Sequence, residues 1–344
     1  MKVSVIGASG YAGAEVLRLL HQHPEVTVSC LTSESSVGQK ISDLYPHFRG
    51  VFDQTLISMT MLDDIAAESD AIFIALPHGH SMEVGKKLAP RGIKIIDLGA
   101  DYRFADTAVY EKWYKVPHTH KDAERVYGLS ELYRDDIRTS SIIGNAGCHT
   151  TAAILALAPL VKHRLIDAGT IVIDSKSGVS GAGRAAKAAY HLPEIYDSFK
   201  AYSATGHRHT PEIEQALSDL AGEAIVVGFT PSLVPMSRGI LSTSYASLMP
   251  GVDGRAIDEA FHDFYADEYF VRLTGEGSYP ETKHVRGANY CDLGWHVDSR
   301  TNRIIVLSAI DNLVKGAAGH AVQNFNIACG FPETLGINQL PLFP

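Results

Sequence analysis

The chain is predicted to be an α/β protein of two domains, and three observations in its 344 residues lead to that expectation. A glycine-rich turn follows the first apolar segment, and short apolar runs then alternate with segments of helical period. After about residue 170 the apolar runs become longer, with fewer helices between them. The first two features are typical of a Rossmann-type, doubly wound parallel sheet. The third predicts an α+β domain built on a large mixed sheet.

The N-terminal elements follow from apolar periodicity. Residues 3–6 are a short apolar run that ends at a glycine, and the apolar residues that follow in 16–20 fall at helical spacing. Residues 26–31, 71–76 and 93–98 are rich in β-branched or apolar side chains, as buried strands are. Because such strands alternate with helices and turns, a parallel order is expected.

The second part of the chain has a different pattern. Residues 170–175, 225–230, 240–248 and 304–309 are predicted to be strands of the mixed sheet. A helix is expected behind Thr210, where Pro211 suits the first helical position and Glu212 favours the helix dipole. Residues 314–329 are helical in period, and their pattern does not decide which domain they contact.

Composition excludes several classes of protein. The net charge of -9 argues against a nucleic acid or an anionic membrane as partner, and the apolar run 152–161 is too short to span a bilayer. The four cysteines are far apart and form no CxxC pair, so neither disulfides nor a structural zinc is expected. We expect a cytoplasmic protein without a bound metal that acts on a small molecule.

The first glycine cluster indicates a dinucleotide site. Gly7, Gly10 and Gly13 stand between the first strand and the first helix. Glycine allows a tight turn and a close approach of the backbone to a pyrophosphate, and the helix end supplies amide donors. The spacing is GxxGxxG instead of the commoner GxGxxG, and a plain glycine turn is the alternative.

The end of the second strand favours NADP over NAD. An NAD site usually places an acid there, whereas this chain has Thr32 and Ser33, followed by Ser35 and Lys40. Hydroxyls and a lysine can bind a 2′-phosphate. Glu34 is the one residue against this interpretation, and a polar loop without a role remains the alternative.

Cys148 is the candidate nucleophile. It follows a strand and a glycine and precedes a helix that is expected to begin at about Thr150. The positive end of a helix dipole lowers a thiol pKa and so produces a usable thiolate. The other cysteines, Cys30, Cys291 and Cys329, lie within strand or helix patterns and are expected to be structural.

Sixteen histidines compete for the role of proton carrier. His207 and His209 stand out because they precede a helix start and flank Arg208, but their spacing does not decide between them. His78 and His80 follow a predicted strand, where either a ligand contact or helix capping would explain them.

Anionic groups of a substrate need basic or amide partners. Ser180 and Gly181 belong to a second glycine cluster, expected to turn near the reaction centre or to be a purely structural bend. Arginine binds two oxygens at once, so Arg103 is a candidate together with Arg208, Arg238 and Lys176. A solvated surface arginine is the alternative for each.

Taken in order, these motifs resemble the N-acetyl-gamma-glutamyl-phosphate reductase family, which is related to aspartate-semialdehyde dehydrogenase. The likeness covers nearly the whole chain and includes GASGYAGAE, ALPHGHS, IDLGADYRF, GNAGCHTTA, SGVSGAGR and HRHTPEIEQ. It implies NADPH-dependent reduction of N-acetylglutamyl 5-phosphate through a thioester on Cys148, with His207 as the base. The family turn usually reads Pro-Gly-Cys-Tyr-Pro-Thr, so Ala146, His149 and Thr150 depart from it.

The resemblance and the patterns together give the expected domains and site. Residues 1–147 with 314–344 are expected to bind NADP, and residues 148–313 to carry catalysis, substrate binding and oligomerisation. Cofactor contacts are expected from Gly7, Ser9, Gly10, Tyr11, Ala12, Gly13, Ser33, Ser35, Pro77, Ser180, Gly181 and Asn312. Substrate contacts are expected from Arg103, Asn145 and Arg208, with backbone amides near Cys148 and Asn145 stabilising the oxyanion.

Two other functions remain open from the sequence. One is reduction of a carrier-protein-linked aminoadipyl or glutamyl phosphate, although no basic run that would bind an acidic carrier is present. The other is a non-catalytic NADP-binding sensor, which the retention of Cys148 and His207 argues against. The strand-rich second part favours a homo-oligomer, either a dimer or a tetramer.

Overall fold

The computed structural model describes residues 1–343, and their contacts divide them into two compact units. Unit 1 comprises Met1–Ala146 and Ala317–Asn338, and unit 2 comprises Gly147–Gly316 with the segment from Gln339 onward. The tail was expected in the first domain, but it contacts unit 2, where the Leu342 amide donates to the Arg286 carbonyl at 2.8 Å. No helix among residues 1–343 is long and apolar enough to cross a membrane.

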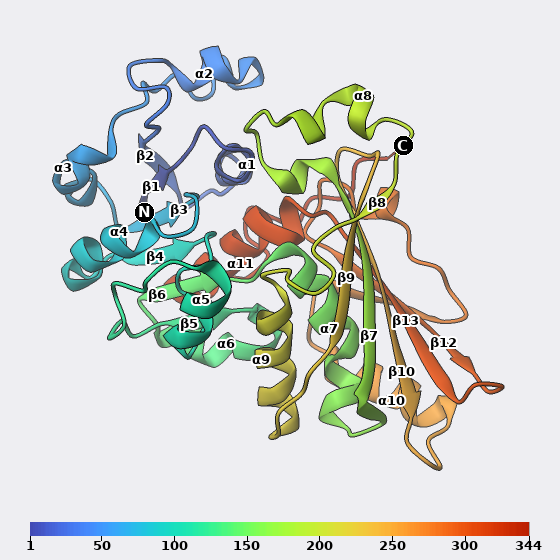
Figure 1. The fold of residues 1–344 in the computed structure, drawn as a ribbon. Coiled ribbons are helices and arrows are strands. Elements are labelled where there is room, and N and C mark those ends of the chain that lie inside the picture. The colour runs from blue at the N-terminus through green and yellow to red at the C-terminus, as the bar shows by residue number, and fades with distance from the viewer. Residues whose placement is uncertain (344) are drawn as a thin grey trace. The chain divides into compact units, whose positions relative to one another are not determined.

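Unit 1 is built on a six-stranded sheet in the order β2-β1-β3-β4-β6-β5 (Figure 1). Every pairing in it is parallel. The strands are β1 (Lys2–Ile6), β2 (Thr27–Leu31), β3 (Ala71–Ile74), β4 (Lys94–Asp97), β5 (Val126–Gly128) and β6 (Ile142–Asn145). The helices are α1 (Tyr11–Leu20), α2 (Ile41–Leu44), α3 (Leu62–Ala67), α4 (Ser81–Leu88), α5 (Thr107–Tyr114), α6 (Ser130–Thr139) and α11 (Gly319–Cys329).

Helix α11 returns late in the chain to complete unit 1, where it contacts α1, α6, β4 and β6. Its polar residues are buried, and Asn324 among them binds the ends of two strands. The Asn324 amide donates to the Gly128 carbonyl at 3.0 Å and to Oδ1 of Asn145 at 2.9 Å. These bonds fix the carboxyl ends of β5 and β6, because a buried carbonyl without a partner would be costly.

Unit 2 is built on a seven-stranded mixed sheet in the order β11-β12-β13-β10-β7-β9-β8 (Figure 1). The strands are β7 (Ile166–Gly178), β8 (Lys200–Ala201), β9 (Gly228–Val234), β10 (Ile240–Leu248), β11 (Val271–Glu276), β12 (Cys291–Asp298) and β13 (Arg303–Ile310). The helices are α7 (Cys148–Lys162), α8 (Leu192–Ile195), α9 (Thr210–Ala221) and α10 (Gly254–Phe264).

Helix α7 is the central helix of unit 2. It contacts β7, β10 and β13 on the sheet and also α9 and α10, so its side chains from His149 to Val161 are all buried. A helix covered on every side has no polar stripe, which explains the nearly continuous apolar sequence after Thr151.

The opposite face of this sheet carries no helix of unit 2 and presents a partly buried apolar strip. Alternation along the strands places Val172, Leu241, Tyr245, Ile305 and Leu307 on this face, and the register pairs Tyr245 with both Val172 and Ile305. Val172 is 49% exposed. The strip is therefore an apolar surface in the middle of a sheet.

The predicted fold class is confirmed, with three differences in detail. β7 is 13 residues long and runs from Ile166 to Gly178, so it extends beyond both ends of the predicted strand 170–175. α7 begins at Cys148 instead of about Thr150. Residues 314–329 are not one helix: a π-helical turn, Val314–Ala318, precedes α11.

Candidate active site

Cys148 is the first residue of α7, and a carboxylate from α9 holds this end of the helix. Glu212 accepts a hydrogen bond from the Gly147 amide at 2.7 Å, and the Thr150 hydroxyl lies 2.9 Å from the same oxygen. Glu212 is fully buried, whereas the Cys148 side chain is partly exposed. The partial positive charge at the helix end stabilises both this carboxylate and a thiolate. The position therefore suits Cys148 to the role of nucleophile.

Gly316 packs closely against Cys148. A Cβ built at Gly316 would lie 2.8 Å from Cβ and 3.1 Å from Cα of Cys148. The Gly316 amide donates to the Asp311 carbonyl at 3.0 Å, which holds the π-helical turn in place. Turns of this kind are frequent at functional sites, and here only a glycine leaves room for the cysteine.

The geometry of His207 fixes the position of its proton. Its Nδ1 accepts the backbone N–H of His209 at 3.2 Å, so the neutral ring carries its hydrogen on Nε2. Burial, together with the charge of Arg208, lowers the pKa of His207 to about 4. At pH 7 the ring is therefore neutral and presents Nε2–H as a hydrogen-bond donor.

Aromatic and imidazole rings surround His207. The ring centroids of His209, Phe229, Tyr202 and His149 lie 4.7, 5.3, 5.5 and 5.6 Å from that of His207. Because His149 follows Cys148 in α7, this cluster lies beside Cys148. His207 and His209, which the sequence could not rank, are thus neighbours, and both lie against the buried ring of His149.

The glycine loop in unit 1 leaves space that a side chain would fill. Gly7 has a φ of +85°, and a Cβ there would lie 2.4 Å from the Ala75 carbonyl oxygen. A Cβ at Gly13 would lie 2.5 Å from the Gly7 carbonyl oxygen. Since both glycines bring the start of α1 against the strands, the loop fits a pyrophosphate at the helix end. Ser9, Gly10, Tyr11 and Ala12 form the remainder of this turn.

Hydroxyl groups gather at the end of β2. The Ser33 hydroxyl lies 2.7 Å from that of Ser9 and 3.4 Å from that of Ser35. Glu34 turns away from them: its carboxylate accepts the Met59 amide at 2.6 Å and the Ser58 hydroxyl. Glu34, the one residue whose charge argued against NADP, therefore binds other groups. The hydroxyl groups of Ser9, Ser33 and Ser35 fit a 2′-phosphate.

Two predicted substrate ligands have partners within unit 1. Arg103 is buried, and its guanidinium donates to the carbonyls of Asn145 at 2.7 Å and Leu98 at 3.0 Å. Asn145 is also buried, with its amide bound to the Ala317 carbonyl at 3.1 Å. Both side chains hold the carboxyl ends of β4 and β6, so contact with a substrate would use only their remaining polar atoms.

The second glycine cluster lies in unit 2, where it contacts Asn312. The Asn312 amide donates to the Ser180 hydroxyl at 3.0 Å and its Oδ1 accepts the Gly239 amide at 2.8 Å. A Cβ at Gly181 would lie 3.6 Å from the Asn312 amide nitrogen. Ser180, Gly181 and Asn312, far apart in the sequence, are thus brought together.

The candidate basic residues of unit 2 differ in their surroundings. Arg208 is exposed beside His207. Arg238 lies 3.5 Å from the buried carboxylate of Asp311, and Lys176 pairs with Asp174 at 2.5 Å. Arg238 and Lys176 therefore lie beside carboxylates of unit 2.

The loop after β3, which contains Pro77, donates hydrogen bonds to the carboxylate of Asp101, a residue that follows the neighbouring strand β4. Asp101 accepts the amides of Gly79 at 2.8 Å and Ser81 at 2.9 Å and so caps α4. The His78 ring contacts Tyr114, with centroids 4.8 Å apart, and His80 makes no side-chain cap. The suggestion that a histidine caps this helix is therefore wrong, because Asp101 does so.

Sequence reasoning did not assign site roles to Glu212, Tyr202 or Gly316. Glu212 was noted only for its place in the first turn of α9, because its local sequence gives no sign of a partner in α7. Tyr202 and Gly316 carry no local motif either. Only the long-range contacts of unit 2 bring them to Cys148.

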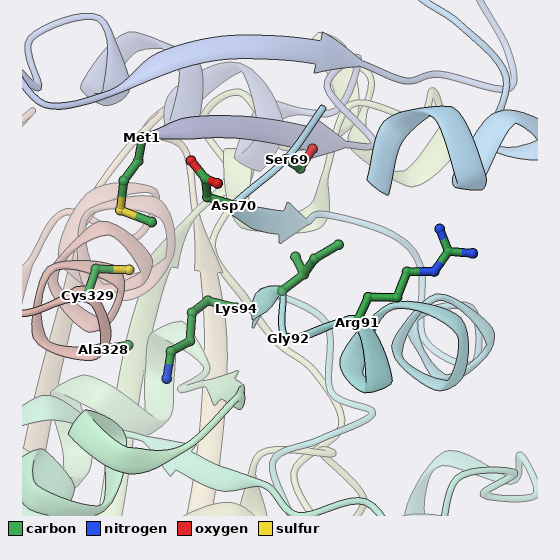
Figure 2. A pocket seen from close by; sticks show the side chains of 9 residues that line it. Met1, Ser69, Asp70, Arg91, Gly92, Lys94, Ala328 and Cys329 are labelled. Atoms are coloured by element: carbon green, nitrogen blue, oxygen red, sulfur yellow. The ribbon is translucent and has the colours of Figure 1, made fainter. Parts of the chain in front are cut away.

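A cavity of about 350 Å³ lies at the amino-terminal ends of the strands of the unit 1 sheet, opposite the strand ends that carry the glycine loop (Figure 2). It is lined by residues that precede β1, β3 and β4 and by the end of α11, among them Met1, Asp70, Lys94 and Cys329. Burial raises the pKa of the Cys329 thiol to about 11, so this cysteine is not a nucleophile. Ligands of doubly wound sheets bind at the carboxyl ends of strands, which excludes this cavity as the cofactor site.

No group of three potential metal ligands occurs among residues 1–343.

Two family models match the chain. The semialdehyde dehydrogenase NAD binding domain matches residues 2–140, and the semialdehyde dehydrogenase dimerisation domain matches residues 148–312. Among solved structures, aspartate semialdehyde dehydrogenase II from Vibrio cholerae has a TM-score of 0.72 at 19% identity, covering 96% of this chain and 98% of that chain. Aspartate semialdehyde dehydrogenase with NADP from Candida albicans has a TM-score of 0.66 at 17% identity, covering 95% and 97%. These structures are similar in fold.

Curated relatives are much more similar in sequence. N-acetyl-gamma-glutamyl-phosphate reductase from Geobacter metallireducens is 54% identical over 100% of both chains. The protein of the same name from Pelotomaculum thermopropionicum is 51% identical over 100% of this chain and 99% of its own length. With about half of its residues identical along its whole length, and with both semialdehyde dehydrogenase domains present, the chain belongs to the N-acetyl-gamma-glutamyl-phosphate reductase family.

Proposed function

We propose that the protein reduces N-acetyl-L-glutamyl 5-phosphate to N-acetyl-L-glutamate 5-semialdehyde with NADPH, releasing phosphate, as a step of arginine biosynthesis. The observation that carries this proposal is Cys148 at the start of α7, a helix end anchored by Glu212, with the partly buried ring of His207 against that of the next residue, His149. The names of the full-length relatives support the substrate.

The first step is acyl transfer to the cysteine. The Cys148 thiolate attacks the carbonyl carbon of the acyl phosphate, a carbon–sulfur bond forms, and the bond to the phosphate oxygen breaks. Phosphate leaves with the electron pair of that bond, so no proton has to be supplied at this stage. The amides at the start of α7 are positioned to stabilise the negative oxygen of the tetrahedral intermediate.

The second step is reduction of the thioester. A nicotinamide cofactor held by unit 1 would supply the hydride that reduces the thioester carbon. Cys148 holds the resulting thiohemiacetal, and the Nε2–H of His207 donates to its oxygen. Collapse of the thiohemiacetal then breaks the carbon–sulfur bond, which yields the aldehyde and returns the thiolate.

The remaining predicted site residues keep their roles as proposals. The turn from Gly7 to Gly13 would hold the pyrophosphate, Ser33 and Ser35 the 2′-phosphate, and Pro77, Ser180, Gly181 and Asn312 the nicotinamide end. Arg208 would bind an anionic group of the substrate. Arg103 and Asn145 would contact the substrate through polar atoms other than those that bind backbone carbonyls.

We also propose that the protein works in the cytoplasm as a homo-oligomer. All four cysteines have free thiols, as a reducing compartment favours. The apolar strip around Tyr245 on the uncovered sheet face suits an isologous contact with a second copy, and the family model of this region is described as a dimerisation domain.

The activity is tested by mixing the purified protein with N-acetylglutamyl phosphate and NADPH and following the nicotinamide absorbance. We expect turnover by the wild type and a loss of at least about 10³-fold in Cys148→Ala, because a methyl group cannot form the thioester. Cys329→Ala, which removes a protonated structural thiol, is the matched control and should keep full activity. Wild-type protein that oxidises no NADPH with this substrate would contradict the proposed function.

His207→Asn separates the two chemical steps. The first step requires only a thiolate, whereas the second loses the Nε2–H hydrogen bond to the thiohemiacetal oxygen, and removal of one such donor typically costs a factor of about 10²–10³. Rapid quench should therefore still detect a burst of phosphate of up to one per site while steady-state NADPH oxidation falls by that factor. His163→Asn, at the exposed end of α7, serves as control. Loss of the burst together with turnover would assign thiolate formation to His207.

Cofactor preference follows from the hydroxyl groups at the end of β2. Since Ser33 and Ser35 can bind a 2′-phosphate and Glu34 is turned away, NADPH should exceed NADH by at least about tenfold in kcat/KM, or about 1.4 kcal/mol. Ser33→Asp should narrow this ratio by placing a negative charge beside the phosphate. Equal use of both cofactors by the wild type would argue against the site.

Self-association is tested at the apolar strip. Tyr245→Arg places a charge in the middle of that face and should shift sedimentation equilibrium toward the monomer. Val51→Arg, a comparable change at an exposed position of unit 1, should leave the distribution unchanged. A wild type that sediments as a monomer at micromolar concentration would rule out the proposed contact.

A further inference from the structure

Two buried carboxylates meet at the start of α4 in unit 1. Asp97 is the last residue of β4 and Asp101 follows it, and their exposed fractions are 0% and 1%. The Ser81 hydroxyl donates to Oδ1 of Asp97 at 2.7 Å, and the Ser81 amide donates to Oδ2 of Asp101 at 2.9 Å. One buried serine therefore binds both carboxyl groups, which brings two acids close together away from water.

The two acids differ in the donors that surround them. Besides Ser81, Asp101 accepts the Gly79 amide at 2.8 Å and the Tyr110 hydroxyl at 2.8 Å. Asp97 has donors on one oxygen only, where the Gly99 amide at 2.9 Å joins the Ser81 hydroxyl. Its Oδ2 is buried and has no hydrogen-bond partner among residues 1–343. Because donors stabilise a carboxylate and burial without them favours the neutral acid, these contacts favour the negative charge on Asp101 and a proton on Asp97.

The other groups packed around the pair are mostly uncharged. Ile74 and Gly144, which pair with Asp97 from β3 and β6, carry no charge. Burial raises the pKa of the Tyr102 and Tyr110 phenols, so both are protonated. The Nε2 of His118 lies 2.7 Å from the Asp101 carbonyl oxygen, and burial lowers the pKa of this ring, so it is neutral at pH 7.

Arg103 is the one cation whose charge acts on Asp97, and its effect is smaller than that of burial. Burial, reinforced by the negative charge of Asp101, raises the pKa of Asp97 to about 7, against the hydrogen bonds from Ser81 and Gly99 and the charge of Arg103. The Arg103 guanidinium also donates to two backbone carbonyls, which share its charge. The pair therefore holds one negative charge at the lower end of the neutral range.

We propose that Asp97 and Asp101 form a pH-sensitive contact that holds the loop between β3 and α4 while Asp97 carries a proton and loosens this loop when Asp97 ionises. After the proton leaves to solvent, two like charges act on one serine in a region of low polarity, where their repulsion is strong. The loop lies at the carboxyl ends of β3 and β4, where doubly wound sheets bind their ligands. The proposal goes beyond the proposed function and does not depend on it.

The first experiment measures thermal stability against pH. An acid whose pKa is raised by folding contributes stability that is fully present below its unfolded pKa, here 3.8, and is lost as the pH rises to about 7. Asp97→Asn keeps the acceptor oxygen for Ser81 and Gly99 but cannot ionise. Its melting temperature relative to the wild type should therefore rise by at least about 4 °C between pH 5 and pH 7.5 and stay constant above that range. Asp122→Asn, an exposed position of unit 1, is the matched control and should show no such rise.

The second experiment measures hydrogen exchange of the loop amides. Asp101 protects the amides of Gly79 and Ser81, so their protection in the wild type, corrected for the intrinsic exchange rate, should fall by at least about fivefold between pH 6 and pH 8.5. In Asp97→Asn the corrected protection should not change over this range.

Three results would overturn the proposal: a melting difference between Asp97→Asn and the wild type that does not vary with pH, wild-type loop protection that does not vary with pH, or an equal loss of protection in Asp97→Asn. The wild-type exchange measurement decides the question even if the variant does not fold. Neither experiment uses the acyl phosphate or a cofactor, so failure here is distinct from failure of the proposed function.

Discussion

The carboxylate of Glu212 joins the first turn of α9 to the first turn of α7, and the geometry of the catalytic cluster depends on this contact. The Gly147 amide and the Thr150 hydroxyl meet one oxygen of a fully buried side chain. The loop that carries His207 ends where α9 begins. Fixing the start of α9 against the start of α7 therefore brings the histidine loop to the cysteine, and a buried charge with defined partners tolerates little displacement.

Neutral imidazole groups near Cys148 are the second property of this site. Burial keeps His207 and His149 uncharged at neutral pH, and the backbone N–H of His209 directs the remaining hydrogen of His207 outward. In a region of low polarity such fixed donors interact strongly with a developing negative charge and need no reorganisation. The arrangement suits a reaction in which negative charge appears first on sulfur and then on oxygen.

The unusual residues around Cys148 have a structural explanation. Where the family turn carries proline after the tyrosine, Thr150 here provides a hydroxyl within 2.9 Å of Glu212, which a proline could not provide. His149 replaces the tyrosine with a ring that has two polar atoms, and both have partners. Ala146 is buried and leaves the backbone turn intact. The departures thus add polar contacts within unit 2.

The sequence by itself determined those features that depend on local chain conformation. Glycines at 7, 10 and 13 after an apolar run predict a backbone turn at a helix end, and Cys148 behind a glycine predicts a thiol at the next one. Alternation of apolar segments predicts both sheets. Only the tertiary structure decided which distant groups meet. Glu212, Tyr202 and Gly316 reach Cys148 or its neighbours in α7 through contacts across 50 or more residues. Arg103, which resembles a substrate ligand in its motif, donates to backbone carbonyls. A side chain's partners depend on how the strands and helices pack, and no local pattern encodes that packing.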